Sequence, residues 1–130
     1  MSNGIEVQIS PGDFIDKLTI LRIKKENVSD PAKAANVQHE HDALQRRFDE
    51  AVERTPELDA LVLRLQDVNR MLWDIEDAIR EKERVKTFDQ EFVEIARSVY
   101  KQNDRRAAIK REINELLGSS LVEEKSYSDY

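Results

Sequence analysis

The chain has 130 residues, of which 37% are charged and 39% hydrophobic, and its formal net charge is −6. It contains no cysteine, which excludes disulfide bonds and thiolate metal sites. The N-terminus shows no signal-peptide pattern, and no apolar run approaches the length of a membrane span. We therefore expect a cytoplasmic protein with one domain over residues 1–130, and the negative charge argues against nucleic-acid binding.

The first ten residues are expected to be extended, because Ile5, Val7 and Ile9 alternate with polar residues as in a short strand. A helix is then expected over 11–27, since Ser10 suits a helix cap and Pro11 suits the first helical position. This helix is apolar on two faces, which is typical of a helix buried between partners. It either fills the centre of a bundle or also contacts another subunit.

Three more helices follow. Pro31 and Pro56 each come after a capping candidate, so helices are expected over 31–54 and 56–84. A fourth is expected from residue 87 or 88 to Gly118, a glycine that suits the position after a helix C-terminus. The short connections favour antiparallel neighbours. We predict an all-α antiparallel bundle of four helices, one short and three long, with a tail over 119–130 that pairs with the N-terminal strand.

The apolar seams of the long helices support this bundle. Over 56–84 the spacing alternates between three and four residues, which is the pattern of helices that pack lengthwise; its members are Leu58, Leu61, Leu65, Val68, Leu72, Ile75 and Ile79. The next seam is interrupted between Val99 and Ile109, where Gln102 and Arg106 take the core positions. Buried polar groups need partners, so we expect Glu76 to pair with Arg106 or Lys110.

Polar and aromatic side chains from several helices are expected to gather around this interruption. They form the candidate binding site: Asp16, Lys17, Asn69, Trp73, Glu76, Arg80, Tyr100, Asn103, Arg106 and Lys110. One interpretation is structural, with ion pairs that fix the register of the helices. The other is a cationic pocket for an anionic small molecule, with Trp73 and Tyr100 as an aromatic wall that stacks on the ligand. The structural interpretation is preferred.

In the binding interpretation, Arg106 and Lys110 would hold the anion, and Glu76 or Asp16 would act as acid or base. The sequence assigns no catalytic residue and indicates no cofactor. Glycine-rich phosphate loops and histidine metal motifs are absent from the sequence. Paired acids occur mainly on faces away from the seams, so we expect no metal site.

Four stretches carry a resemblance. They are ISPGDFIDKLTIL at 9–21, LWDIE at 72–76, YKQNDRR at 100–106 and VEEKSY at 122–127. The chain resembles, over nearly its whole length, a family of small uncharacterised bacterial all-helical proteins with no established activity. The resemblance implies a place near surface-polysaccharide and glycosyltransferase genes, and thus a sugar-phosphate or nucleotide-sugar ligand or an accessory role beside a transferase. It carries over no catalytic residue.

Two functional hypotheses follow. The first is a non-catalytic oligomeric binding or interaction module, accessory to surface-polysaccharide synthesis. The alternative is a small-molecule binder or enzyme that acts on a phosphorylated ligand, a nucleotide or a sugar phosphate, at the polar cluster. The expected partners are a second copy of the chain, through the helix over 11–27 or the uncovered ends of the long helices, and an anionic small molecule or a protein.

Overall fold

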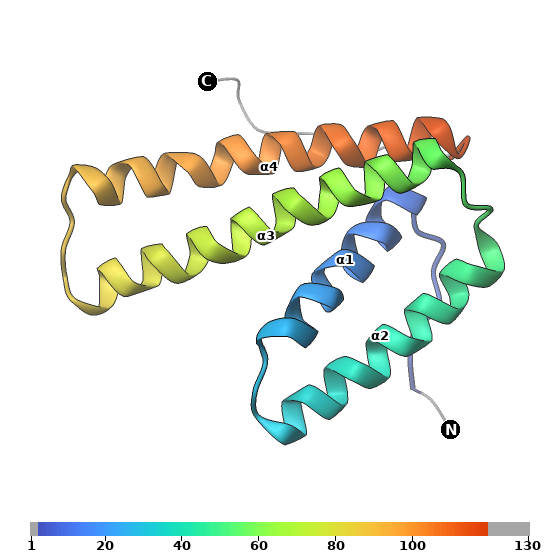
Figure 1. Ribbon diagram of the computed structural model, residues 1–130, viewed down its shortest axis with the longest axis horizontal. Coiled ribbons are helices and arrows are strands. Elements are labelled where there is room, and N and C mark those ends of the chain that lie inside the picture. The colour runs from blue at the N-terminus through green and yellow to red at the C-terminus, as the bar shows by residue number, and fades with distance from the viewer. Residues whose placement is uncertain (1–2, 120–130) are drawn as a thin grey trace.

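The computed structural model describes residues 3–119 and is drawn in Figure 1. Within these residues it contains four packed helices and no strand. The helices are α1 (Pro11–Asn27), α2 (Pro31–Ala51), α3 (Pro56–Arg84) and α4 (Gln90–Leu116). The predicted all-α bundle of four helices is confirmed.

Each helix begins after a side chain that caps it. Ser10, Asp30 and Thr55 accept hydrogen bonds from the backbone N–H three residues further on, at 3.1, 3.1 and 3.2 Å, and a proline follows each of them. Asp89 caps α4 in the same way, through the N–H of Phe92 at 2.9 Å. Helix α4 therefore starts at residue 90, slightly later than the expected 87 or 88.

Gly118 follows the end of α4, as predicted. Its φ of 66° lies in the left-handed region, which glycine adopts without steric cost. The N–H of Gly118 bonds to the carbonyl of Glu115 at 3.3 Å, and that of Ser119 bonds to the carbonyl of Asn114 at 2.9 Å. Helix α2 ends at residue 51 rather than 54, because Val52 is extended and packs against the core.

Helix α1 occupies the centre of the fold. It lies against α2 and against the long hairpin that α3 and α4 form (Figure 1). Within the described residues the backbone of α2 approaches that of no helix except α1, so α2 and α3 are not the neighbours that their short connection predicts. The two apolar faces of α1 explain this, because Ile15, Leu18 and Ile23 are all about 1% exposed.

The core lies where α1 crosses the base of the hairpin. Burial of the seam decreases from there toward the tip: Leu58 and Leu65 are fully buried, whereas Ile75 and Ile79 are only half-buried. Phe88, near the tip, is 56% exposed. The hairpin thus extends beyond α1 and α2 (Figure 1), and we call this part, residues 73–103, the arm.

The N-terminal segment forms no strand in the described part of the chain, contrary to the strand signal. Ile5 and Val7 are 91% and 72% exposed. A strand needs a partner for its backbone, and the tail expected to supply one lies, beyond residue 119, outside the described residues. No helix between residues 3 and 119 has the length and apolarity needed to cross a membrane.

Candidate functional site

Asp16 is the centre of a polar network inside the bundle. Its side chain is 7% exposed, and one carboxylate oxygen accepts hydrogen bonds from Asn69 Nδ2 on α3 at 2.8 Å and from Arg106 Nε on α4 at 2.9 Å. The other oxygen accepts from the Arg106 guanidinium as well, giving a bidentate pair. Asn69 also donates to the Thr19 hydroxyl at 2.9 Å. The network joins α1 to both helices of the hairpin.

A second polar contact lies between the start of α1 and the end of α4. Lys110 Nζ is 2.8 Å from Asp13 Oδ1, and its side chain is only 10% exposed. Asn114 Oδ1 accepts the backbone N–H of Gly12 at 2.7 Å, which supplies one of the hydrogen bonds that a helix N-terminus lacks. Gly12 allows this approach, because a Cβ there would lie 2.6 Å from the Lys110 carbonyl oxygen.

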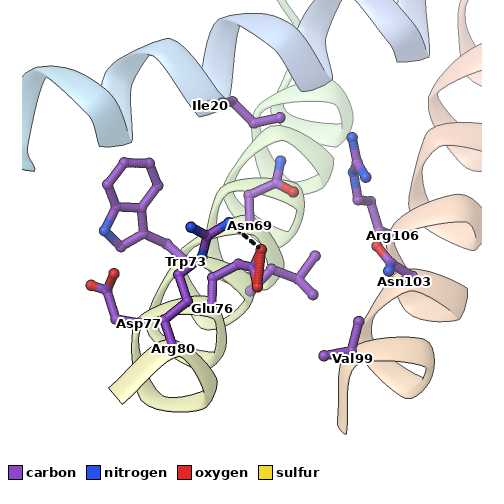
Figure 2. Close-up of a pocket in the computed structure, with 10 residues that line it drawn as sticks. Ile20, Asn69, Trp73, Glu76, Asp77, Arg80, Val99, Asn103 and Arg106 are labelled. Atoms are coloured by element: carbon purple, nitrogen blue, oxygen red, sulfur yellow. Dashed lines mark ion pairs between the residues drawn. The ribbon is translucent and has the colours of Figure 1, made fainter. Parts of the chain in front are cut away.

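An open pocket lies beside the Asp16 network, at the fork where α1 leaves the hairpin. Its volume is about 550 Å³. Figure 2 shows its lining, with α1 across the top, α3 on the left and α4 on the right. The lining side chains are Ile20 from α1; Asn69, Leu72, Trp73, Glu76, Asp77 and Arg80 from α3; and Val99, Asn103 and Arg106 from α4. We call it the fork pocket.

The charges around the fork pocket are balanced. Two acids, Glu76 and Asp77, face two bases, Arg80 and Arg106. Arg80 lies 3.5 Å from Glu76, the pair that is dashed in Figure 2, and Arg106 is paired with Asp16. The lining therefore does not form the cationic pocket that the binding interpretation describes. A ligand with two negative charges would have to compete with ion pairs already present.

Six of the ten predicted site residues line the fork pocket; these are Asn69, Trp73, Glu76, Arg80, Asn103 and Arg106. Asp16 lies behind the pocket wall, bonded to Asn69 and Arg106. Lys110 is further along α4, where it pairs with Asp13. The periodicity therefore placed on one flank of α3 and one flank of α4 side chains that line the same pocket, and their role in binding stays a prediction.

Three expectations about individual residues differ from the structure. Lys17 is exposed on the opposite side of α1, where it pairs with Glu40 at 3.0 Å. Tyr100 does not line the fork pocket; it is 39% exposed and its hydroxyl accepts from Arg97 at 3.3 Å. The acid that binds Arg106 is Asp16 rather than Glu76, because α1 packs against both α3 and α4.

Sequence reasoning missed several residues that matter here. The apolar lining comes from Ile20, Leu72 and Val99. Their positions on apolar faces of their helices did not indicate that they face a pocket. The pair between Lys110 and Asp13, the acid in the first turn of α1, was also not predicted. The sequence signal that could have indicated this pair is Lys110, a basic residue beside the apolar seam of α4.

The chemical capacity of the site follows from these contacts. Both oxygens of Asp16 accept charged or amide donors, so this carboxylate is placed to hold Arg106 rather than to exchange a proton with a substrate. Among residues 3–119 no group of three or more acidic or histidine side chains is arranged to hold a metal. The side chains of the fork pocket that stay accessible include the half-buried Trp73 and the exposed Glu76 and Arg80.

The fold and the site together define a small helical-bundle protein with a polar network in its interior and an open pocket at the fork of its helices. Residues 5–130 match the model of a family described as "Family of unknown function (DUF6165)", and the chain belongs to this family. The resemblance to a family of unknown function is thereby confirmed. Comparison with curated proteins and comparison with solved structures each gave no match.

Proposed function

We propose that this protein is a non-catalytic, oligomeric interaction module whose binding surface is the open face of the arm. We define the open face as the fork-pocket flank of α3 and α4 and its continuation toward the tip: Trp73, Glu76, Asp77, Arg80, Phe92, Ala96, Val99 and Asn103. The single observation that carries the proposal is the contrast between the two sides of the site. The buried polar groups form hydrogen bonds with one another, whereas Trp73 lies in an open pocket.

The polar network supports a structural role for the residues that chemistry would need. Asp16, Asn69 and Arg106 come from three different helices, and each bond between them fixes α1 on the hairpin. A catalytic acid or base must instead reach a substrate proton at hydrogen-bond distance. A network that holds helices in register is the best-attested use of buried ionic groups.

The lining of the fork pocket supports recognition by contact. Trp73 offers a large ring surface, and Leu72, Val99 and Ile20 continue it as apolar lining. Asn103 adds an exposed amide at the rim. A partly exposed aromatic residue surrounded by apolar contacts and a polar rim is the usual composition of a protein interaction surface.

The alternative function, binding of a phosphorylated small molecule, gains less support because the charges of the lining cancel. A ligand titration distinguishes this alternative from the interaction module. The chain has one tryptophan, so fluorescence excited in the indole band reports on the fork pocket alone. We would titrate nucleotides, nucleotide-sugars and sugar phosphates, follow Trp73 emission, and measure melting temperatures in parallel, since a ligand that binds only the native state raises them.

The interaction module predicts no change in emission or melting temperature with any of these compounds, and no turnover of them. A compound that raises the melting temperature of the wild-type chain but not of Trp73→Ala would overturn the proposal in favour of the small-molecule alternative. Trp73→Phe is the matched control, because it keeps an aromatic ring at the site. The accessory role in surface-polysaccharide synthesis rests on the resemblance alone and stays a prediction.

A further inference from the structure

The arm buries its apolar seam incompletely. The seam of the arm includes Ile75 and Ile79 of α3 and Phe92 and Ile95 of α4, and all four are half-buried. At the base of the same seam, where α1 covers the hairpin, Leu65 is fully buried. Two helices alone leave one side of their shared seam open, and helical bundles close that side with further helices. Beyond the end of α1, the described chain supplies no third helix for the arm (Figure 1).

We propose that the arm of a second copy covers the open face, with the two arms antiparallel around a two-fold axis, so that two hairpins form a four-helix bundle. This inference rests on the proposed function and names the partner of the same surface. A closed two-fold dimer is the commonest symmetric assembly, and it requires a surface that is complementary to itself.

The charges on the α3 side of the open face meet this requirement. From base to tip the flank presents Trp73, then the acids Glu76 and Asp77, then the base Arg80. A two-fold axis passing between positions 76 and 80 brings each Glu76 opposite Arg80 of the other copy. Both side chains are largely exposed, 59% and 78%, so they are accessible to such a partner as well as to each other. A parallel arrangement would instead place like charges together.

The α4 side of the open face carries no charge. Phe92, Ala96, Val99 and Asn103 follow one another at spacings of three and four residues, so they share one face of the helix. The first three are half-buried, and the small side chain of Ala96 allows a partner helix to approach closely. A neutral, mainly apolar stripe beside a stripe of alternating charge is the composition expected at a helix–helix contact between subunits.

The size of the open face sets the expected strength. From Trp73 to Arg84, α3 rises about 18 Å, and two helices side by side are about 20 Å wide, so each copy offers about 360 Å² in projection. The two copies together come to about 720 Å², which is below the roughly 1,000 Å² of a stable specific interface. We therefore expect a weak dimer in equilibrium with monomer, with a dissociation constant below about 1 mM.

Sedimentation equilibrium of the full chain tests the proposal. We expect the average mass to rise with concentration from that of one 15.2 kDa chain toward twice that value, and Trp73 emission to shift to shorter wavelength over the same range. Trp73→Ala should weaken the dimer at least tenfold. A chain that remains monomeric up to on the order of 1 mM overturns the proposal, as does a dimer that Trp73→Ala leaves unchanged.

Charge reversals test the antiparallel register. Glu76→Arg and Arg80→Glu should each weaken self-association about tenfold or more, because each places like charges across the axis. An equimolar mixture of the two variants should dimerise at least as well as the wild-type chain, since positions 76 and 80 then carry two bases in one arm and two acids in the other. Lys101→Glu, an equal charge change on the opposite, exposed face of α4, is the control and should leave the mass unchanged.

The failure of this inference can be distinguished from failure of the proposed function. A monomeric chain that responds to no small ligand excludes the second copy, and with it the oligomeric part of the proposed function, but keeps an interaction surface for another protein. A small-molecule response that depends on Trp73 refutes the interaction module itself. Mixed E76R and R80E chains that stay monomeric, while wild-type chains dimerise, refute the antiparallel arrangement of the arms.

Discussion

Replacing Asp16 with asparagine tests whether the polar network holds α1 on the hairpin. Asparagine has nearly the shape of aspartate, but it carries no charge and turns one acceptor oxygen into a donor. That donor would face either Asn69 or the Arg106 guanidinium, both of which are donors in the native structure. The guanidinium would lose its counter-ion in a place where water reaches it only in part.

The magnitude follows from the exposure of the two partners. Removing one member of a fully buried ion pair costs about 3–5 kcal/mol. The side chain of Asp16 is 7% exposed but that of Arg106 is 30% exposed, so hydration recovers part of the loss. We expect the free energy of unfolding to fall by about 2–3 kcal/mol. For 130 residues the unfolding entropy is about 0.27 kcal/mol/K, so the melting temperature should drop by about 7–11 °C.

Urea denaturation followed by far-ultraviolet circular dichroism is the assay. With a slope of about 2 kcal/mol/M, the midpoint should fall by about 1–1.5 M while the slope stays the same. Asp67→Asn, the same change on an exposed part of α3, is the control and should stay within about 0.5 kcal/mol of the wild type. Replacing both partners, with Asp16→Leu and Arg106→Met, should recover most of the loss because no charge is left unpaired. An unchanged midpoint for Asp16→Asn would refute the structural role of the network.

Further predictions concern Gly12, Gly118 and the cap of α4. Gly12→Ala should cost about 1–3 kcal/mol in thermal unfolding, because the new Cβ would meet backbone at 2.6 Å, whereas Gly118→Ala, with free space around it, should cost only about 1 kcal/mol for its left-handed φ. The N–H of Phe92 and then the ammonium of Lys82 lower the pKa of Asp89. The stabilisation from Asp89 is therefore present above the unfolded pKa of about 3.9 and lost as the pH falls through the lower folded value. Asp89→Asn keeps the cap but removes the charge, so its deficit in melting temperature should shrink in acid; a deficit that persists at pH 2 would contradict this assignment.

The helix boundaries were predictable because local chemistry decides them. A capping oxygen and a proline act on backbone groups within one turn, so Ser10 and Thr55 mark helix starts wherever the helices later pack. Gly118 marks a helix end for the same reason. The start of α4 was predicted two or three residues too early, because no proline marks that turn and Asp89 caps the helix.

The candidate site was predictable only as far as helical periodicity reaches. Spacings of three and four residues place Asn69, Trp73 and Glu76 on one flank of α3, and the fork pocket uses that flank. Periodicity does not give the rotation of one helix relative to another. For this reason Tyr100 was assigned to the pocket, although it lies on an exposed part of α4.

Local sequence was therefore sufficient for the number of helices, most of their limits and the interrupted seam, because these depend on contacts within one or two turns. The tertiary structure alone placed α1 between α2 and the hairpin, matched Arg106 with Asp16, and left the arm uncovered. These outcomes depend on which surfaces bury the most apolar area together, a property of all four helices at once. Asp16 and Arg106 are 90 positions apart in the chain, so only the packing of α1 against α4 could bring them into contact.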